Sequence, residues 1–584
     1  MRERILKLAS RPAAWLAVTA AVFAGLLFSN GVPFVYADGY CYYHIARSLT
    51  DHGSFTSPVE PEYFDYKGHV ITEFNGRYAT VCSPGTSLFL LPGIAIGQIL
   101  AGDSDVYTDY FMAFNGHPLT DGIMILLTAA VTGFATLVLL YKAMRELGYT
   151  EKISAAATAI VYSSSFAIWY VMLLPTYTHT YELFAVSLGL YALARYLARP
   201  RMRFAALMGL AGSIAFIVRP TSVIPAVIQG LYLLSKRRFR DACAMIASTV
   251  PALIVWMLYN LESYGSPVAS GYSTIRGETF SLGAFHFFDV LASPHHGWLV
   301  FSPVMLFALA GLVLLLRRKR IIAVLGLATV FGTALIFGFW PSWAGGASFG
   351  SRFMIVAAAF CVPGMAEVLV RISSLRLRSR RTALALLIFL LSWTLVLTGM
   401  YRFTPVGRLT TSGYYTAFDM YRFHFDLLRS SEFPLGWVRA VYGNASGGNS
   451  LLGLLAGAGD YVYRLDTRDV NDIHFKVLKP QQLSHEPETA IEVFVLSGGT
   501  VYRGAMPGSA ENVGFSCKAD GCTGSELLTL TAVTDHPPTL SEREYEGLLV
   551  PGTDIRLLIR RQHSSVFKGR EIYLPPGVYH YDLQ

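Results

Sequence analysis

An aspartate at the end of the first apolar segment is the residue whose surroundings most suggest chemistry. Asp38 is followed closely by Tyr40, Tyr42 and Tyr43. A carboxylate that aromatic rings partly remove from water has a raised pKa, so these neighbours favour Asp38 as a general base. The competing interpretation is that Asp38 caps the helix that follows it. The two roles are compatible.

Three arginines lie in segments that the charge pattern places outside the membrane: Arg219, Arg276 and Arg352. Positive charge is normally avoided there, so each arginine is expected to have a local reason. The segment that ends at Arg352 is rich in glycine, which allows a ligand to approach the backbone closely. Arginine binds phosphate through a charge-assisted fork, and a lipid phosphate is the anion expected at an outer leaflet. The alternatives are pairing with an outer carboxylate or contact with lipid headgroups.

Two histidine-containing motifs are further candidates. His179 and Glu182 lie one helical turn apart at the outer end of an apolar segment. Polar groups that enter a membrane helix usually face the interior or a cavity. This pair could hold a metal, contact a phosphate or stabilise the helix, and one such pair is weak evidence for a metal. We expect His179 to contact phosphate or substrate. His295 and His296 in an outer loop are similar candidates.

The composition requires that membrane-spanning elements position these residues. Of the 584 residues, 53% are hydrophobic and only 15% are charged. Apolar blocks long enough to span a bilayer alternate with short charged stretches, so we expect about eleven membrane helices. The net charge of +8 comes from small clusters between these blocks, which argues against a nucleic-acid partner. The expected helices lie near residues 13–32, 119–141, 153–171, 181–198, 204–218, 221–235, 241–259, 299–316, 321–340, 353–370 and 382–401.

The basic clusters also predict the topology. All of them fall on the inner side if the N-terminus is inside, which places the C-terminus and residues 33–118 outside. Within 33–118, we expect Gly39–Leu49 to form an amphipathic helix on the membrane surface. The apolar run Thr86–Leu100 is short and broken by Pro92, so it is expected to be re-entrant or interfacial. A cleaved signal peptide ending at Ala37 is the competing interpretation of the N-terminus.

The composition changes after the last expected helix. Residues 1–402 are predicted to be the membrane domain, residues 403–469 a connector on the outer surface, and residues 470–584 an all-β domain resembling a sandwich. Cys517 and Cys522 flank a tight turn in that domain and are plausible disulfide partners. Cys41 and Cys82 share the first outer segment, and their pairing is left open because sequence alone cannot fix connectivity.

Several short motifs together carry a family resemblance across roughly residues 30–355. The sequence resembles the GT-C superfamily of integral-membrane glycosyltransferases, whose members use polyprenyl-phosphate sugars. Among these it is most similar to protein O-mannosyltransferases, the lipid A aminoarabinose transferase and arabinofuranosyltransferases. The motifs are Ala37–Arg47, Gly76-Arg77, Ser83–Thr86, Thr178-His179, Arg219–Thr221, Tyr264–Pro267, Ser293–Gly297, Ser302-Pro303 and Trp343–Arg352.

The resemblance implies a GT-C fold and an inverting displacement in which Asp38 is the catalytic base. Many relatives have Asp-Glu at this place, whereas this chain has Asp38-Gly39, so a second acid and a divalent metal both become open questions. We identify no convincing metal-binding set, and no cofactor is certain. Donor-phosphate binding is assigned to Arg219, Arg352 and His179. Substrate binding is assigned to Tyr42, Tyr272, Arg276, Glu182, His295, His296 and Trp343.

The expected function is transfer of one sugar from a polyprenyl-phosphate donor to a hydroxyl of a glycan, glycolipid or protein. The expected location is the plasma (inner) membrane, with the active site and the C-terminal domain extracytoplasmic. One alternative is a glycan ligase or polymerase with a lipid-diphosphate donor. Another is a lipid or glycan transporter, but the helix interiors carry few charges, which favours an enzyme. A receptor would leave the large first outer segment unexplained.

Overall fold

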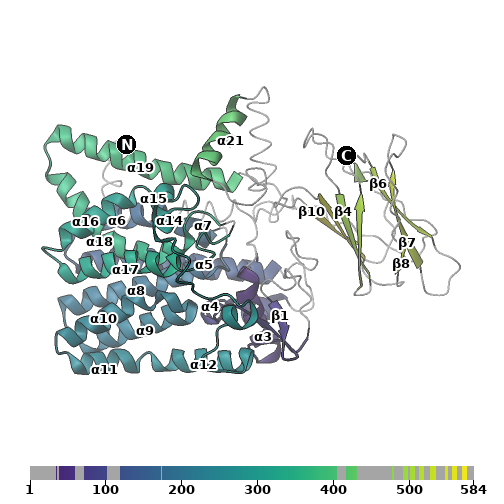
Figure 1. Cartoon of the computed structure of the whole chain (residues 1–584), viewed down its shortest axis with the longest axis horizontal. Coiled ribbons are helices and arrows are strands. Elements are labelled where there is room, and N and C mark those ends of the chain that lie inside the picture. Colours follow the sequence, from purple (N-terminus) through teal and green to yellow (C-terminus); the bar gives the residue numbers. More distant parts are fainter. Residues whose placement is uncertain are drawn as a thin grey trace.

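The computed structural model describes residue 35, residues 38–59, 71–101, 119–172, 174–346, 348–403 and 416–429, and eight β-strands between residues 477 and 574. The first expected membrane helix, near residues 13–32, lies outside the described residues. The described helices form a bundle in which most run side by side (Figure 1).

The main helices of the bundle overlap the apolar blocks that were expected to form membrane helices. They are α5 (Leu119–Glu146), α6 (Glu151–Ser164), α7 (Ala167–Met172), α8 (Thr178–Ala198), α9 (Met202–Val218), α10 (Ile224–Ser235), α11 (Phe239–Ala247), α12 (Val250–Tyr264), α16 (Met305–Leu315), α17 (Arg320–Gly338), α18 (Ile355–Ser374) and α19 (Leu377–Phe403). Short elements in the loops are η1 (Pro220–Val223), α13 (Gly271–Ile275), α14 (Phe287–Ala292), α15 (Trp298–Phe301) and η2 (Arg352–Met354).

Five helical segments of the described chain are long and apolar enough to cross a membrane: 120–146, 239–264, 320–338, 352–374 and 377–401. Shorter apolar helices cover residues 85–100, 202–218, 220–235 and 305–315. These segments support a membrane protein. The number of eleven spans and the N-inside orientation stay predictions. The expected span 153–171 is divided between α6 and α7, and the expected span 241–259 between α11 and α12.

Helix α18 is the centre of the bundle. Within the apolar segment 352–374, 94% of the 18-residue membrane-spanning stretch is buried inside the protein. The corresponding share is 17% in segment 239–264 and in segment 377–401. Figure 1 accordingly shows α11, α12 and α19 along the edges of the bundle. A Cβ on Gly311 of α16 would collide with the carbonyl oxygen of Gly364 in α18. Small residues at such crossings let membrane helices pack backbone against backbone.

The described residues between 38 and 101 form two helices and a hairpin. Helix α3 (Asp38–His52) and helix α4 (Gly85–Ala101) flank the antiparallel strands β1 (Ile71–Phe74) and β2 (Arg77–Thr80). The hairpin turn is Asn75-Gly76, and both residues have positive φ, of 53° and 73°. An Asn-Gly turn of this kind matches the twist of the two strands.

Two differences from expectation concern these helices. Helix α3 forms, but Gly39–Ala46 are buried within the protein, so it packs as an internal element and not as a helix lying on a surface. The expected break at Pro92 is wrong, because α4 continues through that residue. Proline removes one helical hydrogen bond, a loss that helices of membrane proteins tolerate, and Pro92 lies on the exposed side of α4.

Covalent and polar contacts hold α3 in place. Cys41 and Cys82 form a disulfide with their Cα atoms 5.9 Å apart, which joins α3 to the segment after β2. The hydroxyl of Tyr259 in α12 donates to the carbonyl oxygen of Cys82 at 2.5 Å, and the hydroxyl of Tyr264 donates to that of Thr80 at 2.6 Å. The start of α3 is therefore fixed relative to the bundle.

Eight strands follow in the C-terminal region, and all of their pairings are antiparallel. One sheet has the order β10-β9-β4-β5 and the other β3-β6-β7-β8. That they form one extracytoplasmic β-sandwich stays a prediction, and the pair Cys517–Cys522 lies outside the described side chains. The strands are β3 (Val477–Leu478), β4 (Ile491–Ser497), β5 (Thr500–Met506), β6 (Asn512–Lys518), β7 (Glu526–Val533), β8 (Glu546–Leu549), β9 (Ile555–Arg561) and β10 (Gly569–Leu574).

Of the proposed connector 403–469, the structure describes one further helix, α21 (Ala417–Arg429), which packs against α19. The division of the chain into three domains stays a prediction.

Candidate active site

Asp38 and Arg352 form an ion pair where α3 and η2 begin. Asp38 begins α3, Arg352 begins η2, and Arg352 Nη1 donates to Asp38 Oδ2 at 2.8 Å. The two side chains are 21% and 13% exposed, so both are largely shielded but accessible from one side. Gly345 permits the position of Arg352, because a Cβ on Gly345 would lie 2.8 Å from Arg352 Nε.

The ion pair reverses the expected direction of the pKa shift at Asp38. Burial raises the pKa of Asp38, as the aromatic surroundings predicted, but the nearby charges of Arg352 and Arg219 outweigh it. The result is a pKa below the ordinary value of 3.8. The expectation of a raised pKa is therefore wrong for this state of the molecule, since opposite charges within a few ångströms favour the carboxylate.

Arg219 lies beside this pair at the end of α9. Its guanidinium carbon is 5.2 Å from the centroid of the Phe353 ring, and that of Arg352 is 5.3 Å from the same ring. Two cationic groups therefore share one aromatic ring, which attracts both. The backbone at the end of α9 is fixed by close contact with α4, because a Cβ on Gly85 would collide with the amide nitrogen of Val218.

A second polar cluster adjoins Arg219. His179 and Glu182 are buried in the first turns of α8, and His179 Nδ1 lies 3.3 Å from Glu182 Oε2. Arg219 Nη1 lies 3.8 Å from the same oxygen, and the Ser222 hydroxyl donates to Glu182 Oε1. Of the three residues predicted to bind the donor phosphate, Arg219 and Arg352 thus lie near Asp38, and His179 is linked to Arg219 through Glu182.

Several polar atoms of this region are buried and make no hydrogen bond to any described residue: His179 Nε2, Arg219 Nη1, Thr221 Oγ1, Arg352 Nε and Ser351 Oγ. Nearly all buried polar groups in proteins have a partner, so each such atom needs an explanation. Four of the five can donate hydrogen bonds in any protonation state, and the fifth belongs to an imidazole. Such donors suit an oxygen-rich anion.

Tyr42 and Tyr272 supply an aromatic boundary. Tyr42 lies one turn after Asp38 on α3 and is buried, and burial together with the neighbouring Tyr272 phenol raises its pKa. Tyr272 meets Trp340 edge to face at 5.7 Å. Arg276 lies near enough to lower the pKa of Asp38 further, and its Nη1 is 3.9 Å from Glu278 Oε1.

The remaining candidates are His295, His296 and Trp343, and of these His296 lies close enough to Arg352 for its pKa to be affected by that charge. His295 is exposed, whereas His296 is buried, and burial lowers its pKa to about 4. Trp343 stacks on His286 at 5.7 Å. The structure does not record a contact of any of these predicted residues with Asp38 within the described part of the chain, and their roles in substrate binding stay predictions.

Four neighbours of the site were given no functional role on the basis of the sequence. They are Tyr177, Ser222, Phe353 and Thr221. Tyr177 lies 5.8 Å from the Arg352 guanidinium, measured to the ring centroid. Each adjoins a residue or motif that was singled out, such as His179 or Arg219. Their proximity in the sequence was the available signal, but a hydroxyl or ring next to a charged residue is too common to be selected without the fold.

The position after Asp38 bears on metal binding. A Cβ on Gly39 would collide with the Thr176 hydroxyl, so an acidic side chain at this position would require Thr176 to move. Asp38 is instead paired with an arginine. The described residues contain no group of three or more His, Cys, Asp or Glu side chains arranged to hold a metal. Among the residues that the structure describes, the groups around Asp38 therefore do not form a binding set for a divalent cation.

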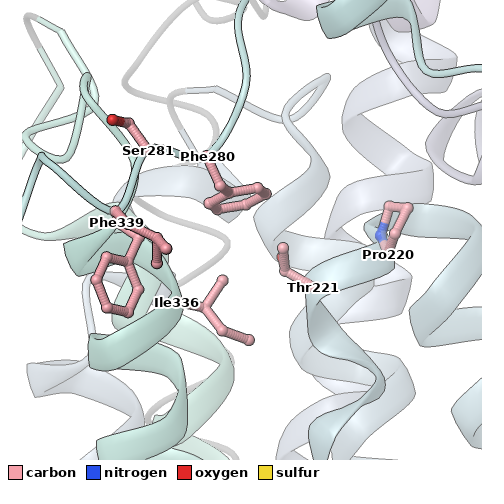
Figure 2. A pocket seen from close by; sticks show the side chains of 7 residues that line it. Pro220, Thr221, Phe280, Ser281, Ile336 and Phe339 are labelled. Carbon is pink, nitrogen blue, oxygen red and sulfur yellow. The ribbon is translucent and has the colours of Figure 1, made fainter.

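An apolar cavity of about 420 Å³ is lined on one side by Pro220 and Thr221, the two residues that follow Arg219 in the sequence. Figure 2 shows Pro220 and Thr221 of η1 on one side of it, facing Phe280, Ser281, Ile336 and Phe339 on the other. Leu282 completes its lining. A cavity of this size can enclose part of an apolar ligand.

No protein-family model and no curated protein matches this chain. Solved structures with a similar chain course include ArnT from Cupriavidus metallidurans bound to undecaprenyl phosphate, with 15% identity, a TM-score of 0.44, and coverage of 81% of this chain and 83% of ArnT. The oligosaccharyltransferase AglB from Archaeoglobus fulgidus, in complex with an inhibitory peptide and a dolichol-phosphate, has 13% identity and a TM-score of 0.38. There the match covers 74% of this chain and 63% of AglB. Similarities this distant do not assign a function.

Proposed function

We propose that this chain is a membrane glycosyltransferase that transfers a single sugar from a polyprenyl-phosphate donor to an extracytoplasmic hydroxyl group. The observation that carries the proposal is the convergence of Asp38, Arg352 and Arg219, which come from three distant parts of the chain. A carboxylate next to two guanidinium groups provides a proton acceptor and an anion site within one region. Inverting transfer from a phosphate-linked donor needs both.

The proposed step is one displacement at the anomeric carbon. The acceptor oxygen forms a bond to that carbon while the bond from the carbon to the donor phosphate oxygen breaks. The hydroxyl proton passes to Asp38. The donor phosphodiester carries one negative charge, and the departing polyprenyl phosphate gains a second. Arg219 and Arg352 hold this developing charge, with His179 beside them.

The low pKa of Asp38 is compatible with this role. As the new bond forms, the acceptor oxygen becomes positively charged and its proton becomes acidic, so a weakly basic carboxylate can accept it. Arg352 would bind the Asp38 carboxylate in the absence of donor and the donor phosphate in its presence. A donor phosphate that attracts the Arg352 guanidinium would weaken its bond to Asp38, and the carboxylate would become more basic when the donor is in place.

The surroundings of Arg219 favour a lipid donor. Arg219 Nη1 and the Thr221 hydroxyl are buried and make no hydrogen bond to a described residue, and Thr221 also lines the apolar cavity. A phosphate at Arg219 would leave the adjoining cavity for the first apolar units of a polyprenyl chain. Such a donor carries its activated sugar to the outer side of the plasma membrane, where the acceptor would be a glycan, glycolipid or protein.

Binding and donor cleavage of the purified full-length chain test the proposal. Polyprenyl phosphate should raise the thermal transition temperature at micromolar concentration, and mass spectrometry should detect this lipid among copurified molecules. A set of polyprenyl-phosphate hexoses and pentoses should contain one that is cleaved to polyprenyl phosphate. Cleavage of a polyprenyl-diphosphate glycan instead would favour a ligase or polymerase. Binding without cleavage or transfer of any donor would favour a transporter.

A further inference from the structure

Glu182 is the most deeply buried carboxylate at the site and is the common partner of its neighbours. It is 1% exposed. His179 Nδ1 and Arg219 Nη1 lie 3.3 and 3.8 Å from its Oε2, and the Ser222 hydroxyl donates to its Oε1. Both oxygens are thus engaged by the protein. A carboxylate so placed would also repel a phosphate, so direct donor binding by Glu182 is disfavoured.

The contact with Glu182 restricts the chemistry of His179. Because Nδ1 faces a carboxylate, the proton of the imidazole is held on Nδ1. Nε2 then donates a hydrogen bond only when the ring carries a second proton and is cationic. Nε2 is buried and has no hydrogen-bond partner among the described residues. It is therefore available to a ligand.

The charges at this cluster match the second charge of a phosphate. Glu182 and Arg219 together are close to neutral, so a proton on His179 adds one net positive charge. The groups that face His179 comprise Glu182 on its own helix, Tyr177 just before it, Tyr170 of α7, Arg219 at the end of α9 and Arg352 of η2. Without a bound anion, burial and the charges of Arg219 and Arg352 lower the pKa of His179 to about 4, against the opposing effect of Glu182. The second proton of the imidazole therefore needs the charge of a bound phosphate as well as that of Glu182.

We propose that Glu182 is a positioning residue that orients Arg219 and, when the donor phosphate is bound, stabilises a protonated His179, so that both residues bind the same phosphate. This inference rests on the proposed function, because it takes the anion to be the donor phosphate. Glu182 does not touch the phosphate. It acts by fixing the Arg219 guanidinium and by placing the imidazole proton on Nδ1, so that Nε2–H donates to the departing oxygen.

The test compares Glu182→Gln and Glu182→Asp with the unaltered chain in full-length form, with polyprenyl phosphate as the probe. Glu182→Gln should raise the dissociation constant at least about tenfold, since an orienting buried charge is lost. Its binding should also weaken at a lower pH than in the unaltered chain, because the amide no longer stabilises the His179 cation. Glu182→Asp keeps the charge and should recover part of the affinity and of the pH profile.

The outcomes separate this inference from the proposed function. If the unaltered chain does not bind polyprenyl phosphate, the proposed function fails. If the unaltered chain binds and Glu182→Gln binds with the same affinity and pH profile, the role of Glu182 is refuted. If Glu182 has only a structural role, both variants should lose thermal stability and the fraction of protein able to bind to the same extent, with an unchanged pH profile of binding. That result would also refute the proposed role of Glu182. His179→Gln should remove the pH dependence that Glu182→Gln shifts.

Discussion

Arg352 donates a hydrogen bond of 2.8 Å to Asp38 across 314 residues of sequence. The contact joins the start of α3 to the start of η2, and it places the proposed base in direct contact with the proposed phosphate ligand. In the absence of an anion, each group neutralises the other. The pair therefore keeps a largely buried carboxylate charged and keeps an arginine ready for exchange to a phosphate.

Asp38→Asn should reduce donor cleavage at least about a hundredfold, because the amide cannot accept the proton. Folding should persist, since the amide oxygen still accepts from Arg352. The measurement is release of polyprenyl phosphate by protein that elutes normally in size-exclusion chromatography. Glu73→Gln, at an exposed position of β1, is the matched control and should be fully active. Near-normal turnover by Asp38→Asn would exclude Asp38 as the base.

Arg352→Gln should make kcat/KM decrease at acidic pH. In the unaltered chain, Arg352 and Arg219 hold the pKa of Asp38 below 3.8, so Asp38 causes no loss of kcat/KM between about pH 5 and 7. Without Arg352, burial dominates and raises the pKa of Asp38, so kcat/KM should fall as the pH decreases in this range. Arg201→Gln, at an exposed site, should keep the flat profile. An unchanged profile in Arg352→Gln would contradict this account of Asp38.

Gly85→Ala should weaken donor binding through the backbone of α9. The new Cβ would collide with the amide nitrogen of Val218, the residue before Arg219, and neither backbone can yield without moving that arginine. We expect the KM for the donor to rise several-fold. Gly399→Ala is the control, because a Cβ at Gly399 meets no atom within 4 Å. Equal KM values in the two variants would show that the α4–α9 contact does not position Arg219.

Removal of the disulfide should destabilise the first outer segment. Cys41 and Cys82 close a loop of 41 residues, and a loop of this length corresponds to about 4 kcal/mol in the chain-entropy description. Cys82→Ser should therefore lower the thermal transition temperature and make the segment sensitive to protease. Cys243→Ser removes an exposed free thiol and is the control. If Cys82→Ser is as stable as Cys243→Ser, the disulfide contributes little to stability.

His44 should make stability depend on pH. It is buried on α3, its Nε2 lies 3.0 Å from the carbonyl oxygen of Tyr78, and burial lowers its pKa to about 4. The unfolded chain binds a proton near pH 6.5, so this contribution to stability is complete above pH 6.5. It is lost as the pH falls toward 4, at about 1.4 kcal/mol per pH unit.

The measurement is the transition temperature of the purified chain and of His44→Gln between pH 7.5 and about 4.5. The unaltered chain should lose more stability than His44→Gln on acidification. Only the unaltered chain has an imidazole at this position, which binds a proton more weakly in the folded state than in the unfolded state. His52→Gln, at an exposed position of the same helix, should follow the unaltered chain. Parallel curves for His44→Gln and the unaltered chain would contradict the burial of a neutral His44.

The sequence by itself determined the class of protein and most of its helices. Long apolar runs can only be satisfied in a membrane or a core, so blocks such as 321–340 and 353–370 predicted α17 and α18 nearly to their bounds. It also determined which charged residues were unusual, because Arg219 and Arg352 stand where the insertion bias disfavours positive charge. Such signals are local, and a single chain reports them directly.

Only the tertiary structure decided how these residues act on one another. The direction of the Asp38 pKa shift depends on an arginine that is 314 residues away, and no local pattern specifies that pairing. Electrostatic energy depends on distance and burial, and these quantities are set by packing. The sequence therefore identified the participants at the site, and the fold determined which of them meet.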